Sequence, residues 1–147
     1  MRRHSLFLGA ALVPFLLAAA CGAPPSPSPP PARTPTGAAA VSGVDGAARA
    51  YVDAVNAGDL DALVAAFAPE AEIIDVTRSI KGHDAIRTWA DNEVIGGTLR
   101  VLAIAERRPD GQKLLVHWAP GGSGGWRAHY DFTLAGGRIV RADLQYA

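Results

Sequence analysis

Cysteine is nearly absent from this chain, and the one that occurs, Cys21, has no partner for an internal disulfide. An excess of charge of either sign is also missing, because 14 basic and 14 acidic residues cancel to a formal net charge of zero. A neutral chain offers no basic field that would attract nucleic acid or an anionic membrane surface. We therefore expect no nucleic-acid partner.

Sequence motifs for cofactors and metals are missing as well. No Gly-x-Gly-x-x-Gly follows a strand, and there is no phosphate loop and no serine–histidine–aspartate order. No two of His83, His117 and His129 stand at the local spacing of metal ligands, and no cysteine is available to join them. We therefore expect neither a metal nor a cofactor.

The chain begins with an apolar N-terminal segment. A short basic start, Met-Arg-Arg-His, precedes an apolar run from Leu6 to Ala20. This run is too short to cross a bilayer comfortably, and it has the organisation of a secretory signal peptide. We assign residues 1–20 to that signal and expect the rest of the chain to lie outside the cytoplasm.

The end of the apolar run, Leu17-Ala18-Ala19-Ala20-Cys21-Gly22, resembles the lipobox of bacterial lipoproteins. The usual leucine three residues before the cysteine is Ala18 here, with Leu17 one place further out. The resemblance implies that Cys21 is lipidated, becomes the new N-terminus and tethers the protein to the outer face of a membrane. The alternative is ordinary cleavage after Ala20, which would give a secreted protein with a free thiol.

Residues 21–43 form a linker rich in proline, alanine and serine. Seven of the chain's eleven prolines lie between Gly22 and Ser42, and large apolar side chains are absent until Val41. Such a segment cannot bury a core and favours extended polyproline II. We interpret it as a stalk that holds the domain up to roughly 60 Å from its anchor, at about 3.1 Å per residue.

The remaining residues, 44–147, are predicted to form one folded domain. A first helix is indicated by apolar residues at i, i+4, i+7 and i+11 spacing: Val44, Ala48, Tyr51 and Val55. Asn56-Ala57-Gly58 ends this helix, because Gly58 suits the left-handed position after a helix. Asp59 follows as the N-cap of a second helix. So short a turn makes the two helices pack as a hairpin.

The second helix is expected to end at Pro69. Its apolar stripe consists of Leu60, Leu63, Val64 and Phe67. Residues 71–76 are rich in β-branched side chains and predict a strand, and residues 77–81 predict a polar loop. A third helix is expected to begin at Gly82-His83-Asp84. The residues that share one face of it are Ile86, Trp89, Ala90 and Val94.

Strands are predicted for the rest of the chain. Their expected ranges are 98–107, 113–119, 125–134 and 138–146. The segments between them carry glycine-rich turn chemistry, as in Pro109-Asp110-Gly111 and Gly136-Gly137. Short connections between long strands indicate an antiparallel meander. Helices first and an antiparallel sheet afterwards is an α+β order.

Three motifs in this order resemble the nuclear-transport-factor-2-like superfamily, and within it the SnoaL-like proteins and bacterial ketosteroid isomerases. The motifs lie at residues 51–63, 67–75 and 82–89. The resemblance implies a cone in which N-terminal helices pack on a strongly bent antiparallel sheet and enclose a deep apolar cavity. It also implies a small apolar ligand, and a homodimer through the outer face of the sheet as an option.

The resemblance places Asp75 where ketosteroid isomerases keep their general base, and Tyr51 where a tyrosine donates a hydrogen bond to the developing enolate. Such a pair transfers protons without a cofactor. For a third member, counting without gaps gives His129, and a different hairpin length gives Tyr130 or Asp131. The isomerases commonly have proline after the base, where this chain has Val76. The residues implied to line the cavity are Val55, Phe67, Ile73, Trp89, Trp118 and Tyr130, with Trp126 at its wall or rim.

Two classes of function follow. The first is a membrane-tethered domain that binds a small molecule without chemistry. The second is an isomerase-like or dehydratase-like enzyme that uses Asp75 and Tyr51. Simple packing of Tyr51, and a tie between Asp75 and Arg78, are the structural alternatives for the two residues. An Asp75 carboxylate locked by Arg78 would remove the main support for the enzyme.

Overall fold

Two short helices joined by a left-handed glycine open the described part of the chain. The computed structural model describes residues 40–147, so the signal peptide, Cys21 and most of the linker lie outside the described residues. The first helix, α1 (Gly46–Ala57), buries Ala48, Tyr51 and Val55, as the apolar spacing predicted. Gly58 follows it at φ 68°. Within these described residues, no helix is long and apolar enough to cross a membrane.

The second helix begins as predicted and ends earlier than predicted. In α2 (Leu60–Ala65) the Asp59 side chain accepts a hydrogen bond from the Ala62 amide at 2.8 Å. The prediction that this helix continues to Pro69 is wrong, because β1 (Phe67–Asp75) already starts at Phe67. The register of β1 against its neighbour shifts between Phe67 and Glu72. An irregular stretch of this kind tolerates proline, which has no amide hydrogen for a ladder.

Residues 77–81 do not form the expected polar loop. Four of them form β2 (Arg78–Lys81), an edge strand that pairs antiparallel with β1, with Asp75 opposite Arg78. The strand is short and mostly exposed, so it shows no apolar alternation that could reveal it in the sequence. The two-residue turn that joins the strands contains Val76, whose φ is 57°.

The remaining elements follow the predicted order. They are α3 (His83–Glu93), β3 (Thr98–Arg108), β4 (Gly111–Ala119), β5 (Trp126–Ala135) and β6 (Arg138–Tyr146). The face predicted for the third helix is confirmed, because Ile86, Trp89, Ala90 and Val94 are all buried.

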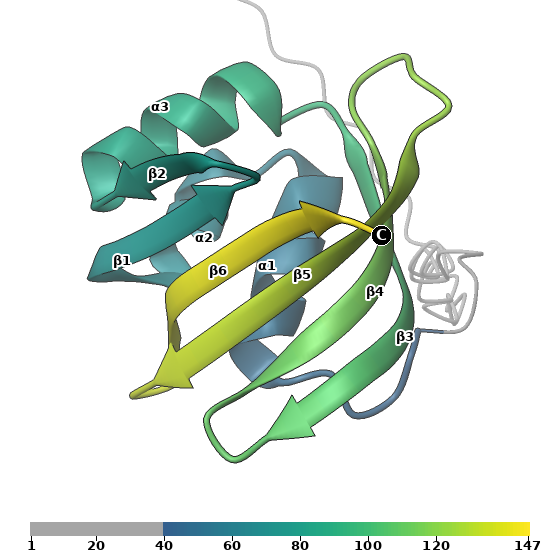
Figure 1. The fold of residues 1–147 in the computed structure, drawn as a ribbon. Helices are drawn as coiled ribbons and strands as arrows, with labels where there is room; N and C mark the ends of the chain where they lie inside the picture. The colour runs from purple at the N-terminus through teal and green to yellow at the C-terminus, as the bar shows by residue number, and fades with distance from the viewer. Residues whose placement is uncertain (1–39) are drawn as a thin grey trace, which may run out of the picture. The chain divides into compact units, whose positions relative to one another are not determined.

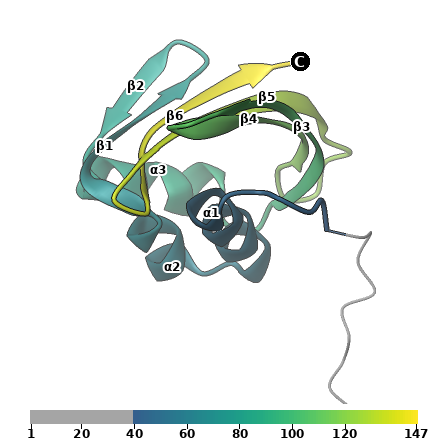
Figure 2. The same cartoon turned by 90° about the horizontal axis from the view of Figure 1, so that it is seen from below.

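One curved sheet of six strands, in the order β2-β1-β6-β5-β4-β3, has the helices packed against its concave face (Figure 1 and Figure 2). Strands β3 to β6 form the predicted antiparallel meander. The expectation of a wholly antiparallel sheet is wrong at one place, because β1 pairs with β6 in parallel. These two strands are far apart in sequence, so no hairpin dictates their relative direction. The α+β order and the cone of helices on a bent sheet are confirmed.

Aromatic rings form the centre of the core between α1 and the sheet. The Tyr51 ring lies 5.7 Å from that of Phe67 and 5.6 Å from that of Phe132, measured between centroids. The ring of Tyr130 lies 6.3 Å from that of Tyr51. Phe67 and Phe132 are fully buried. Tyr51 therefore packs in the core, as its helical spacing predicted. Its ring is next to that of Tyr130, which belongs to the site described below.

Candidate functional site

A cavity of about 500 Å³ lies between the β1–β2 turn, the end of α3 and the ends of β4, β5 and β6. All three tryptophans of the chain line it, together with Tyr130 and Tyr146. Its charged side chains are Asp75, Arg78 and Glu93. The other lining residues are Val76, Thr77, Val94, Pro120, Ala128, Leu144 and Gln145. The cavity thus combines an aromatic wall with a small charged group at one side.

Strand alternation delivers the aromatic wall. Along β5 the residues Trp126, Ala128 and Tyr130 fall on one face by the two-residue period, and all three line the cavity. Trp118 on β4 is the direct cross-strand partner of Trp126. Trp118 is 8% exposed and Trp126 is 39% exposed, so the first belongs to the wall and the second to the rim.

Strand register places Asp75 in the same row as Tyr130. Asp75 is opposite Leu144 across the parallel β1–β6 pair, and Leu144 is opposite Tyr130 across the antiparallel β5–β6 pair. Two strand spacings separate the Asp75 and Tyr130 backbones, which is roughly 10 Å. Both side chains line the same cavity, so the strand positions alone bring an acid and a phenol to one chamber.

The residues predicted to line the cavity divide into two sets. Trp89, Trp118 and Tyr130 line it. Val55, Phe67 and Ile73 are at most 1% exposed and pack in the core instead. The sequence alone cannot separate the cavity-lining residues from the core residues, because both kinds are apolar and lie on the same faces of their helices and strands.

Asp75 is not a free carboxylate. Its Oδ2 atom accepts a hydrogen bond from Nη2 of Arg78 and another from Nε1 of Trp89 at 3.3 Å. The same guanidinium binds Glu93 of α3 through two contacts of 2.9 and 2.6 Å. Arg78 therefore bridges two carboxylates at the cavity edge. The alternative in which Arg78 ties Asp75 is the arrangement found.

The phenols of Tyr51 and Tyr130 are neutral hydrogen-bond donors at ordinary pH. Burial, with smaller contributions from Tyr130 and Asp75, raises the pKa of Tyr51 well above its usual value. Burial and then Asp75 raise the pKa of Tyr130. Tyr130 is 6% exposed and lines the cavity. Tyr51 lies behind it and does not line the cavity.

Of the three alternatives for a third site residue, Tyr130 is the one that lines the cavity. His129 is the next residue along β5 and therefore belongs to the opposite face of the strand. Asp131 lies on that same outer face and accepts a 2.6 Å hydrogen bond from Arg108. The structure thus brings Asp75 and Tyr130 together and leaves His129 apart from them.

Val76, the residue after Asp75, adopts a backbone conformation that proline cannot reach. Its φ of 57° is in the left-handed region, where a β-branched residue is strained, and proline is fixed near −65°. The turn is fixed at both polar groups of Val76. Its amide donates to the Leu144 carbonyl at 2.9 Å, and its carbonyl accepts from Gln145 at 3.0 Å. The departure from the isomerase pattern is therefore a difference in backbone geometry as well as in residue type.

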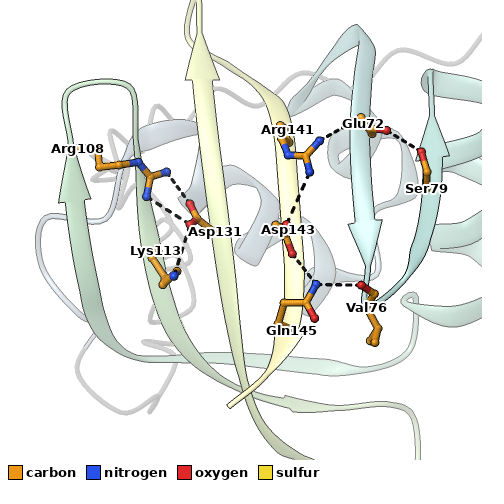
Figure 3. A network of polar contacts seen from close by, with 9 residues as sticks. All are labelled: Glu72, Val76, Ser79, Arg108, Lys113, Asp131, Arg141, Asp143 and Gln145. Carbon is orange, nitrogen blue, oxygen red and sulfur yellow. Dashed lines mark hydrogen bonds and ion pairs between the residues drawn. The ribbon is translucent and has the colours of Figure 1, made fainter.

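The outer face of the sheet carries a separate network of ion pairs (Figure 3). Arg108 binds Asp131 on one side of it, and Arg141 binds Glu72 at 2.6 Å on the other. Gln145 donates to Asp143 at 2.6 Å as well as to Val76, which connects this face to the turn beside the cavity. A homodimer through this face stays a prediction, and its interface would be polar rather than apolar.

Several residues of the site carry no sequence signal for it. Glu93 meets Arg78 only because α3 crosses the end of the β1–β2 hairpin, and the two residues are 15 positions apart. Tyr146 and Gln145 lie near the chain end, where nothing in the pattern indicated a cavity. In residues 40–147, no cluster of three or more histidine, cysteine or acidic side chains is arranged to hold a metal ion. The expectation of no metal stays a prediction.

Comparison with known proteins gives the same family. The profile of the SnoaL-like domain matches residues 48–142, so the protein belongs to the SnoaL-like family. A protein from Sphaerobacter thermophilus is 25% identical, with a TM-score of 0.61 over 69% of this chain and 93% of that one. A protein from Sinorhizobium meliloti, provisionally assigned as a polyketide cyclase, is also 25% identical, with a TM-score of 0.59 over 67% of this chain and 93% of that one.

A protein from Kribbella flavida, provisionally assigned as a ketosteroid isomerase, shares the fold at 17% identity. Its TM-score is 0.58 over 69% of this chain and 75% of that one. Among curated proteins, none has significant sequence similarity to this chain. Proteins with this fold thus carry different provisional assignments, and the fold alone does not choose between them.

The bridge from Arg78 to Glu93 predicts a change in a measurable pKa. Hydrogen bonding and charge from Arg78 lower the pKa of Glu93 from its ordinary 4.5. The contribution of this bridge to the stability of the folded protein is present above pH 4.5 and is lost as pH falls through the lowered pKa of Glu93. We expect Arg78→Gln to raise the Glu93 pKa toward 4.5, measured by carboxyl-carbon NMR titration. Arg87→Gln, which removes an ion pair with Asp61, should leave it unchanged. No rise in Arg78→Gln would contradict the bridge.

Proposed function

We propose that this SnoaL-like domain binds a small, largely apolar molecule in the cavity and works outside the cytoplasm, tethered to a membrane through lipidated Cys21. The observation that carries the binding part is the aromatic cavity. A volume of about 500 Å³ is within the usual range of small-molecule pockets. Three tryptophans and two tyrosines around one such space provide large apolar faces for stacking.

The polar groups of the cavity are few, as expected for a site that orients one apolar molecule. Tyr130 supplies a neutral phenol, and Asp75 and Glu93 lie at one side. A phenol hydroxyl both donates and accepts hydrogen bonds, so a polar atom of the ligand can pair with it. This supports binding of a molecule with an apolar body and at least one polar atom.

Truncating the aromatic rim should weaken binding. We expect Trp126→Ala in the full-length protein to reduce affinity for a neutral probe, 2-(2-naphthyl)ethanol, by about tenfold, because one stacking face of roughly 1 kcal/mol or more is lost. Isothermal titration calorimetry measures the affinity. The matched control is Arg127→Ala, at the adjacent position on the outer face of β5, which should bind like the unmodified protein. Equal affinities for the two variants would contradict a ligand at this rim.

The tether is proposed from the first 43 residues. A lone cysteine directly after an apolar signal run, followed by a proline-rich segment, fits a lipid anchor with an extended spacer. A spacer of this composition would hold the cavity away from the membrane surface, where it could meet small molecules in solution or in transit.

Replacing the proposed lipidation site should release the protein. We expect Cys21→Ser to move the full-length protein from the membrane fraction to the soluble extracytoplasmic fraction, because a buried acyl chain contributes about 0.8 kcal/mol per CH₂ group to membrane binding. Cell fractionation with immunoblotting measures this distribution. A Cys21→Ser protein that stays with the membrane argues against lipid as the anchor.

A second candidate, proton transfer at carbon beside a carbonyl, has one observation in its favour. Asp75 and Tyr130 line the same cavity, in one row across the sheet, which suits a base facing an oxyanion donor. The Arg78 bridge weighs against it, since Oδ2 of Asp75 already accepts hydrogen bonds from Arg78 and Trp89. Tyr51 supports this chemistry only through contact with Tyr130, because it does not line the cavity.

Because of the Arg78 bridge, we expect binding without turnover. The full-length protein and its Asp75→Asn variant should isomerise a β,γ-unsaturated ketosteroid at the same background rate, followed by the absorbance of the conjugated product. A rate at least 100-fold above that of Asp75→Asn would instead establish Asp75 as a general base and favour the second candidate.

A further inference from the structure

The charged group beside the cavity has a net negative charge. Its members are two carboxylates, Asp75 and Glu93, and one guanidinium, Arg78. The three side chains are 22%, 46% and 54% exposed, so they lie at the entrance rather than in the interior. Arg78 is the cation that occupies the space between the acids, and it reaches there from the exposed edge strand β2.

Arg78 can leave this position without disturbing the core. Its side chain is more than half exposed, so water and salt screen its ion pairs. Its strand is only four residues long and follows the turn that holds Val76 at a positive φ. A competing cation could therefore take the place of the guanidinium while Arg78 turns into solvent.

The aromatic wall of the cavity is adjacent to the two carboxylates. Trp89 donates a hydrogen bond from Nε1 to Asp75, so its indole lies directly beside the acid. The indoles of Trp118 and Trp126 and the phenol of Tyr130 face the same cavity. Aromatic faces attract cations, with tryptophan the most effective. The phenol oxygen of Tyr130 can also accept a hydrogen bond from an ammonium group.

From these contacts we infer that the ligand is an organic cation: an amine or ammonium group on an apolar body, with its charge between Asp75 and Glu93 in place of the Arg78 guanidinium and its body against Trp118 and Trp126. This inference rests on the proposed small-molecule binding and specifies its class. Removing Arg78 changes the net charge of the group from −1 to −2, since the two acids then remain alone. An anionic ligand would meet net repulsion here.

The test compares three probes with one apolar body in the full-length protein, using isothermal titration calorimetry. The probes are 2-(2-naphthyl)ethylammonium, 2-(2-naphthyl)ethanol and 2-naphthylacetate. We expect the ammonium probe to bind about tenfold more tightly than the alcohol, and the carboxylate to bind most weakly. The advantage of the ammonium probe should shrink as ionic strength rises, because the acids are partly exposed.

Variants of the charged group provide the second arm. Arg78→Gln should strengthen ammonium binding about tenfold, and Glu93→Gln should weaken it about tenfold, and both changes should be larger for the ammonium probe than for the alcohol. Glu93 is exposed and outside the core, so this variant is expected to fold. Arg87→Gln, whose partner Asp61 is outside the cavity lining, is the matched control and should change neither probe.

The outcomes separate this inference from the proposed function. Alcohol binding equal to or tighter than ammonium binding would overturn the cation and leave the small-molecule site standing. If the carboxylate probe binds most tightly, and this binding is lost in Arg78→Gln, the inference of a cation is overturned in favour of an anion held by Arg78. Binding by none of the three probes would overturn both the inference and the proposed site.

Discussion

The parallel pairing of β1 with β6 is the constraint on which the site depends. It joins the first strand of the domain to the last and sets Asp75 opposite Leu144, which in turn is opposite Tyr130. A shift of one residue in this register would turn Asp75 toward the outer face, because strand side chains alternate with a period of two. The irregular pairing around Pro69 is confined to the bulge between Phe67 and Glu72, so the register of β1 with β6 is regular next to the cavity.

The turn that follows β1 converts this register into a charged group. The turn between β1 and β2 consists of two residues, so Arg78 lies opposite Asp75 and contacts it directly. The contact extends to Glu93, which ties the hairpin to the end of α3. The same contact occupies the Oδ2 atom of Asp75, which also accepts a hydrogen bond from Trp89. The carboxylate at the cavity is therefore already engaged by two donors of the protein.

The elements with strong apolar periodicity could be predicted from the sequence. The faces of α1 and α3 and the meander of β3 to β6 follow from residue spacing and turn glycines. The misses occur where long-range pairing overrides local pattern. Phe67 is buried equally well at the end of a helix or the start of a strand, and β2 is an exposed edge without alternation. The parallel β1–β6 pair joins segments about 70 residues apart, and no local feature encodes its direction.

The same limit explains how much of the site could be predicted. The resemblance placed Asp75 at the cavity, and the aromatic residues Trp89, Trp118 and Tyr130 were expected to line it. Tyr130 rather than His129 faces inward because side chains alternate along β5, and Tyr130 lies on the same face as Trp126. Counting residues back from the hairpin after β5 did not reveal this alternation. Glu93 came to the site through the packing of α3 against β2, which is a tertiary contact. Function depends on the residues of a site rather than on the fold that carries it, and in this chain Arg78 and Glu93 reach the site through tertiary contacts that no local pattern encodes.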